Sequence, residues 1–224
     1  MTQAVASAFR TLWKRVAPRP AKDNSPVRTG PNGTFVFIHI NKNAGTSIGH
    51  AIGLPKKQHL TVKEVIDIVG RAQWERAFRF SIVRNPWDKV VSHYNHRVKT
   101  NQTAMKDNPI SFKEWVAATY GPVKDPRYYD QPKMFQPQVE WLKDDRGRIE
   151  LDFIGRFEDL GNTYRQIADR IGVTAELPHL NKSERSDYRR SYDDATAAVV
   201  GEWFREDIAR FGYAFDSAPA SQSR

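Results

Sequence analysis

The chain has 224 residues, of which 39% are hydrophobic and 12% aromatic, so it is long enough for one sizeable core and too short for two comfortable domains. It contains no cysteine, which excludes a disulfide framework and a thiolate metal site, and no apolar run approaches the roughly 18 to 20 residues that span a bilayer. The net charge of +9 favours an anionic partner, such as nucleic acid, an anionic membrane or an anionic small molecule.

Much of the positive charge lies in residues 1–30, where six Lys and Arg residues stand against a single acid, Asp23. Apolar residues from Val5 to Val16 recur there at helical spacing, and Pro18 ends the pattern. A short basic helix of this kind suits contact with a membrane surface or a partner. An arm that packs on its own domain, or that has no fixed structure, explains the same residues. We therefore expect a basic N-terminal arm over 1–30 and a mildly basic folded body.

Short apolar runs then alternate with helical patterns. The runs at 35–40, 78–83 and 148–155 suit buried strands, and a helical pattern follows each of them. The helical pattern over 158–172, which follows the third run, and a last one over 193–212 both end in glycines typical of helix C-caps. This alternation predicts a three-layer α/β/α domain around a mainly parallel sheet over residues 31–215, followed by a disordered tail over 216–224.

A turn of small and polar residues, 41–47, follows the first strand candidate. We expect Gly45 to take backbone angles that other residues avoid. The N–H groups of the following helix and the hydroxyls of Thr46 and Ser47 favour a phosphate, and Lys42 adds a positive charge. The pattern therefore predicts a phosphate loop at the carboxyl edge of the sheet, where parallel α/β sheets bind ligands.

This loop differs from that of an NTPase, in which the lysine follows the last glycine of G-x-x-x-x-G-K-[ST]; here Lys42 precedes Gly45. An NTPase also needs an acidic metal ligand at the end of a neighbouring strand, whereas Arg84 follows the strand candidate at 78–83. Arg84 and Ser92, on the next helix, are spaced to hold a second anionic group. Two phosphate sites without a metal ligand suggest a nucleotide phosphorylated at two separate positions. A P-loop kinase or NTPase and a basic nucleic-acid-binding module remain the alternatives.

Two segments carry a family resemblance. FIHINKNAGTSI resembles the 5′-phosphosulfate loop, and FSIVRNPWDKVVSHY the 3′-phosphate motif, of sulfotransferases that use 3′-phosphoadenosine-5′-phosphosulfate. Within that group the chain is most similar to the heparan, chondroitin and related carbohydrate sulfotransferases and their bacterial members. The resemblance extends through DFIGRFEDL, LPHLNKSERSDYRRSY and DIARFGYAF, over about residues 34–215. It implies a P-loop NTPase-like topology and a sulfotransferase that uses this donor as its cofactor.

The resemblance also implies roles for residues. Transfer to a hydroxyl would be in-line and metal-independent, because cations and N–H dipoles stabilise the leaving 3′,5′-bisphosphate, and Lys42 would lie against the bridging oxygen. The nucleotide-binding residues that it implies are Lys42, Asn43, Ala44, Gly45, Thr46, Ser47, Arg84, Ser92, Lys182 and Ser183. Asn41 and Asn43 depart from the common family loop P-K-[TS]-[AG]-G-T. We expect Asn43 to change one hydrogen bond to the sulfonate or the 5′-phosphate.

Six histidines compete for the role of the base that takes the acceptor proton. His59 lies in a polar segment just before a helix N-terminal signal at Thr61 and Glu64. Because related sulfotransferases draw their base from this region, we expect His59 to be the base, with His50 as the alternative. The other four have different expected places: His39 inside the first strand as a packed core residue, His93 and His96 on one helix without a third metal ligand, and His179 in a structural role.

The acceptor is predicted less sharply. Residues 99–147 are rich in Tyr, Trp, Gln, Asn, Lys and Arg, which are the side chains that a saccharide groove requires and also ordinary loop residues. We expect a saccharide or another hydroxyl-bearing acceptor and no nucleic-acid partner. We expect a cytoplasmic protein, with peripheral membrane contact through residues 1–30 left open. The sequence does not predict the oligomeric state.

Overall fold

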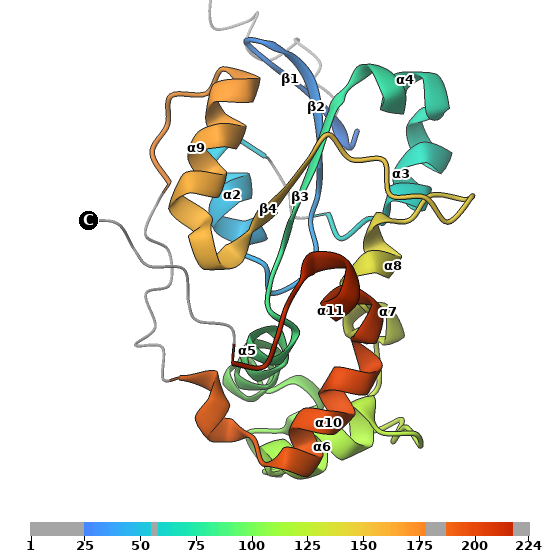
Figure 1. Ribbon diagram of the computed structural model, residues 1–224, viewed down its shortest axis with the longest axis vertical. Helices are drawn as coiled ribbons and strands as arrows, with labels where there is room; N and C mark the ends of the chain where they lie inside the picture. Colours follow the sequence, from blue (N-terminus) through green and yellow to red (C-terminus); the bar gives the residue numbers. More distant parts are fainter. Residues whose placement is uncertain (1–24, 55–57, 178–186, 217–224) are drawn as a thin grey trace, which may run out of the picture.

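A computed structural model describes residues 25–54, 58–177 and 187–216 (Figure 1). At its centre is a four-stranded sheet in the order β1-β2-β3-β4. The strands are β1 Val27–Gly30, β2 Gly33–Ile38, β3 Phe78–Val83 and β4 Phe153–Arg156. β1 pairs antiparallel with β2, whereas β2, β3 and β4 are parallel.

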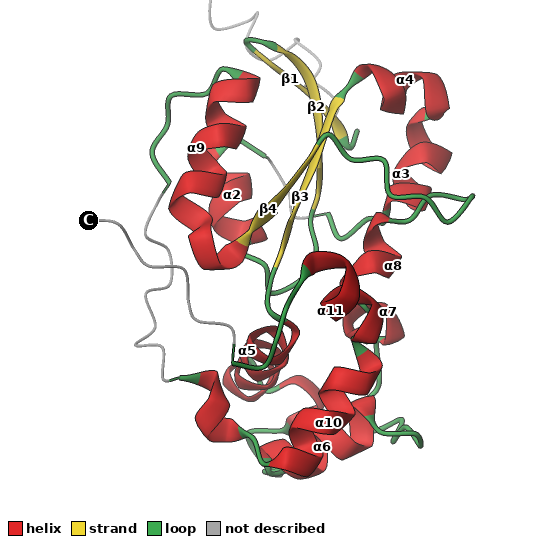
Figure 2. Ribbon diagram, viewed as in Figure 1, coloured by secondary structure: helices red, strands yellow, loops and turns green. Residues whose placement is uncertain are grey.

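Helices cover both faces of this sheet, as Figures 1 and 2 show. On one face lie α2 Gly45–Ala51 and α9 Leu160–Ile171, and on the other α3 Val62–Val69, α4 Arg71–Arg76 and α8 Gln138–Leu142. Side chains alternate along β2, so that Phe35 packs with α2 and α9 while Val36 packs with α3 and α4. Apolar residues on both faces are the reason for the continuous apolar run in the sequence. The predicted three-layer α/β/α fold with a mainly parallel sheet is confirmed.

A group of helices lies beyond the carboxyl end of β3, at the lower end of Figure 1. It comprises α5 Pro86–Lys99, α6 Phe112–Tyr120, α7 Pro132–Phe135, α10 Asp194–Trp203 and α11 Arg205–Phe211. Three short 3₁₀ helices complete the described elements: η1 Gln102–Ala104, η2 Phe157–Asp159 and η3 Tyr188–Ser191. Most of these helices share an apolar cluster that includes Trp87, Trp115 and Phe204. This cluster supports the end of the sheet at which the predicted phosphate loop begins.

Local signals place several helix ends correctly. Thr61 and Glu64 form the predicted capping box at the start of α3, and Asn85 caps α5 ahead of Pro86. Gly172 and Gly212 follow α9 and α11 in the left-handed conformation, with φ of 79° and 63°. Each of these ends depends on residues within one turn, which is why the sequence predicts them.

Other boundaries are corrected. Residues 27–30, placed in the arm, form an edge strand of the sheet, while residues 1–24 and 217–224 lie outside the described part of the chain. β2 ends at Ile38 rather than at residue 40. The single helix predicted over 193–212 divides at Phe204 into α10 and α11. Among the described helices, none is both long and apolar enough to cross a membrane.

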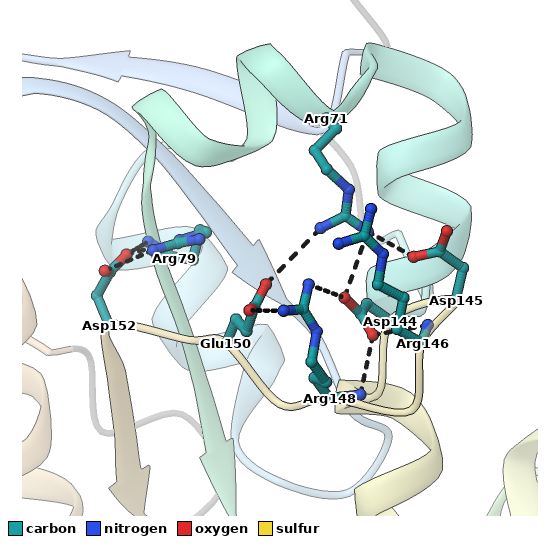
Figure 3. Close-up of polar contacts among 8 residues, drawn as sticks. All are labelled: Arg71, Arg79, Asp144, Asp145, Arg146, Arg148, Glu150 and Asp152. Carbon is teal, nitrogen blue, oxygen red and sulfur yellow. Dashed lines mark hydrogen bonds and ion pairs between the residues drawn. The ribbon is translucent and has the colours of Figure 1, made fainter.

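The third strand candidate, 148–155, begins only at Phe153 because charged pairs hold the segment before it (Figure 3). The buried carboxylate of Asp144 accepts hydrogen bonds from the main-chain N–H groups of Arg146 and Arg148, at 2.9 and 2.8 Å, and from Arg71 at 3.3 Å. Arg79 on β3 donates through both its main chain and its guanidinium to Asp152, and these bonds lower the pKa of Asp152. The ion pairs therefore fix the entry into β4, at the end of the sheet opposite the predicted phosphate loop.

Candidate active site

The connection from β2 to α2 turns sharply at two residues. Lys42 and Ala44 both have left-handed backbone angles, with φ of 66° and 61°, and α2 begins at Gly45 without a side-chain cap on its first turn. Thr46 is exposed there and Ser47 is buried. The uncapped N–H groups and the adjacent lysine make this helix start suitable for an anion.

Gly45 is required for a reason other than the predicted one, because the positive φ values fall on Lys42 and Ala44 and not on it. A Cβ atom at Gly45 would lie 1.8 Å from Cδ2 and 1.9 Å from Nε2 of His39. The glycine therefore makes room for the His39 imidazole against the start of α2. His39 is buried as expected, but it lies just after β2 rather than inside it.

The two asparagines that depart from the family loop anchor it from within. The Asn43 amide nitrogen donates to the carbonyl of Ile82 at 2.8 Å and to Oε1 of Gln138 at 2.7 Å, and the residue is almost fully buried. Asn41 donates to the carbonyl of Met134 at 2.9 Å. The Asn43 amide is thus held inside the protein by Ile82 and Gln138, and its altered hydrogen bond to a sulfonate or phosphate stays a prediction.

Arg84 joins the loop to the end of β3. Its Nη1 donates to the carbonyl oxygen of Lys42 at 2.8 Å, and its guanidinium lies 4.0 Å from the centre of the Phe157 ring. Nε and Nη2 donate to the two carboxylate oxygens of Asp88 at 2.8 and 2.7 Å. The structure therefore brings the two predicted phosphate motifs together, and Asp88 engages Arg84 from the first turn of α5. Ser92, two turns along the same helix, is half-buried.

His59 lies against the same loop. Its Nδ1 is 3.0 Å from the carbonyl oxygen of His39, and the two imidazole rings are 4.3 Å apart between centres. A carbonyl oxygen only accepts hydrogen bonds, so we assign the proton of the neutral ring to Nδ1. Nε2 is then the nitrogen with a lone pair. The His59 ring also packs edge-on against the Trp141 ring, with 6.2 Å between the ring centres.

The remaining described histidines are placed elsewhere. His50 is exposed in the last turn of α2. His93 is buried in α5 with Nδ1 at 3.4 Å from the Tyr120 hydroxyl, and burial lowers its pKa well below the usual value. His179 lies outside the described residues, as do Lys182 and Ser183 of the predicted late nucleotide loop.

With this geometry in place, comparison with known proteins gives the family. The model of the sulfotransferase family matches residues 11–214. The chain belongs to the sulfotransferase family. It is 27% identical over 125 residues to an uncharacterized protein of Archaeoglobus fulgidus, a match that covers 54% of this chain and 91% of that protein. It is also similar to the crystal structure of a sulfotransferase from Alicyclobacillus acidocaldarius, at 21% identity and a TM-score of 0.33, over 67% of this chain and 66% of that one.

Sequence reasoning missed Gln138, which holds the predicted phosphate loop from within. It is fully buried, and its Oε1 accepts from the Asn43 amide and from the main-chain N–H of Arg84 at 2.7 and 2.9 Å. Its Nε2 donates to the Arg84 carbonyl at 2.8 Å and to Asp207 on α11 at 3.1 Å. One amide therefore joins the loop, β3 and the C-terminal helix. No local pattern marks it, because its partners lie far away in the sequence.

Replacing Gln138 with leucine should destabilise the protein by about 2 to 4 kcal/mol, since buried donors of Asn43 and Arg84 lose their acceptor. Thermal or urea unfolding measures the change. Gln131→Leu is the matched control, because Gln131 is exposed at the start of α7 and makes no side-chain cap, so its effect should stay within about 0.5 kcal/mol. Equal stability of the two variants would show that Gln138 is dispensable.

The aromatic residues of segment 99–147, which suited either a saccharide groove or ordinary loops, divide between the core and the surface. Its aromatic residues Trp115, Tyr120 and Trp141 are buried and pack in the apolar clusters. Tyr128 and Tyr129 remain half-buried at the surface. Trp115, Tyr120 and Trp141 are therefore core residues, and the acceptor site stays a prediction.

Proposed function

We propose that this protein transfers a sulfuryl group from 3′-phosphoadenosine-5′-phosphosulfate to a hydroxyl of an acceptor, with a saccharide as the acceptor class. The observation that carries the proposal is that Arg84 and His59 both contact the segment of Lys42, at the carboxyl ends of β2 and β3. Arg84 donates a hydrogen bond to the carbonyl of Lys42. His59 contacts the carbonyl of His39, which lies three residues before Lys42. Two cations and a histidine are thus held at the same loop, and the proposal makes Nε2 of that histidine the base.

In the proposed binding mode the first turn of α2 and Lys42 hold the 5′-phosphosulfate, and Arg84 and Ser92 hold the 3′-phosphate. Arg84 exchanges part of its bidentate pairing with Asp88 for the phosphate, which carries more charge than a carboxylate. The nearly complete burial of the guanidinium and its contact with Phe157 favour this exchange, because both keep water away from the charged group. Lys182 and Ser183 complete the proposed nucleotide site.

The proposed transfer needs a base and a stabilised leaving group. Nε2 of His59 takes the proton of the acceptor hydroxyl while its oxygen forms a bond to sulfur. The bond between sulfur and the bridging oxygen breaks, and the charge that develops on that oxygen is stabilised by Lys42 and the N–H groups of α2. The hydrogen bond between Nδ1 and the His39 carbonyl orients the ring throughout. The acceptor class rests on the resemblance to carbohydrate sulfotransferases.

The donor site is tested with Arg84→Ala. We expect its affinity for 3′-phosphoadenosine-5′-phosphate, measured by calorimetry, to fall by about 30- to 1000-fold, which corresponds to roughly 2 to 4 kcal/mol for a lost charged donor to a phosphate. Arg79→Ala is the matched control, because Arg79 makes a similar ion pair with Asp152 at the other end of β3 and should leave the affinity unchanged. Equal binding by Arg84→Ala and the parent protein would remove Arg84 from the site. A thermal response to magnesium-ATP in place of the bisphosphate would instead favour a kinase or NTPase.

A further inference from the structure

Lys89, in the first turns of α5, is enclosed completely by the protein. Among the described residues its ammonium has no hydrogen-bond partner, and it lies 5.6 Å from the centre of the Phe204 ring. A buried charge is normally retained only where it is paired and hydrogen-bonded. The retention of a buried, unpaired ammonium at this position is therefore not explained by packing alone.

The charges that act on Lys89 come from three segments that the Gln138 amide joins by hydrogen bonds to Asn43, Arg84 and Asp207. Asp207 on α11 attracts its ammonium, while Arg84 at the end of β3 and Lys42 in the phosphate loop repel it. His93, one turn further along α5, is neutral because burial lowers its pKa. Burial, helped by the two cations and opposed by Asp207, lowers the pKa of Lys89 to about 8.

The Asp207 carboxylate is already engaged in hydrogen bonds to the start of α8. It accepts from the main-chain N–H groups of Gln138 and Val139 at 2.8 and 2.9 Å, and burial raises its pKa. It therefore neutralises Lys89 only in part. Three cations, Lys42, Arg84 and Lys89, thus share one region with Asp88 and Asp207 as the acids that oppose them.

We propose that Lys89 is an internal cation of the anion site, and that occupation of the phosphate loop by a bisphosphate nucleotide draws a proton onto its amine. The inference rests on the proposed function. An anion beside Lys42 and Arg84 cancels the repulsion that these two charges exert on Lys89, so the protonated form becomes more stable once the ligand is bound. Lys89 then contributes to affinity through charge and not through a direct hydrogen bond.

The proposal fixes the sign of the pH dependence. At pH 7 Lys89 is already largely protonated, whereas near pH 8 about half of the molecules must take up a proton on binding. Affinity should therefore decrease as the pH rises above 8, by up to about tenfold per unit. The phosphate groups of the ligand do not cause this change, since their second pKa of about 6 leaves their charge constant in that range.

Calorimetric titration of the full-length protein with 3′-phosphoadenosine-5′-phosphate, at pH 8 in two buffers of different ionisation enthalpy, measures the protons taken up. We expect about half a proton for the parent protein. Lys89→Arg keeps the charge but does not titrate, so it should bind without proton uptake. Lys89→Met should also show no uptake and bind about tenfold more weakly at pH 7. Lys99→Met, at an exposed position at the end of the same helix, should behave as the parent.

Three results would overturn the inference. Binding by the parent protein without proton uptake at pH 8 refutes it directly. Undiminished uptake in Lys89→Arg assigns the proton to another group. If the parent does not bind the nucleotide at either pH, the proposed function fails together with the inference, which distinguishes that outcome from the first two. Should Lys89→Met fail to fold, the parent protein and Lys89→Arg still decide the question.

Discussion

His59→Ala should lower the rate of sulfuryl transfer to a hydroxyl acceptor by about 10² to 10⁴-fold, the usual contribution of a general base, without weakening nucleotide binding. The hydrogen bond from Nδ1 to the His39 carbonyl orients the ring, and the proposal makes Nε2 the atom that takes the acceptor proton. The rate of the parent protein should rise with pH as the imidazole loses its proton, and the residual rate of the variant should lack this rise. Transfer of labelled sulfate across a pH series, with calorimetry for binding, measures both.

His50→Ala is the matched control, because His50 is exposed in α2 and makes no contact with the His39 carbonyl that would orient it. It should retain most of the activity. Full activity of His59→Ala together with an inactive His50→Ala would move the base to α2. Activity in both variants would show that the base is not one of these two histidines, and only the donor half of the proposal would stand.

Lys42→Ala should reduce turnover by about 10² to 10³-fold, as expected for one electrostatic donor to a leaving oxygen, while nucleotide affinity falls less. The structure explains why the site should survive the change. The carbonyl oxygen of Lys42, and not its side chain, accepts the hydrogen bond from Arg84, so alanine preserves that link. Single-turnover kinetics give the rate of transfer, and titration with the bisphosphate gives the affinity.

Lys143→Ala provides the control for Lys42, because Lys143 pairs with Glu140 and Glu206 away from the loop and should leave turnover unchanged. A large loss of nucleotide affinity in Lys42→Ala, with unchanged turnover, would contradict the proposal. That result would assign Lys42 to uniform binding of the nucleotide rather than to the leaving oxygen.

The amino-acid sequence by itself determined the layers of the fold and the order of the site motifs. Apolar runs at 35–40 and 78–83 predicted parallel strands buried on both faces, and β2 and β3 lie there within two residues. Thr61 and Glu64 predicted the start of α3, and Gly172 the end of α9. These features depend on hydrophobic period and on hydrogen bonds within one turn, so they are encoded in short stretches of the chain.

Only the tertiary structure decided which residues meet at the loop. Gln138 contacts Asn43 across 95 positions and Arg84 across 54, and Asn43 turns inward because that buried acceptor is present. The His39 ring packs against the start of α2, because Gly45 has no side chain that would occupy that space. Trp115 and Tyr120 are buried because apolar residues from distant segments, such as Phe135 and Phe204, pack around them. A side chain's role at such positions is decided by packing between distant segments, which no local pattern records.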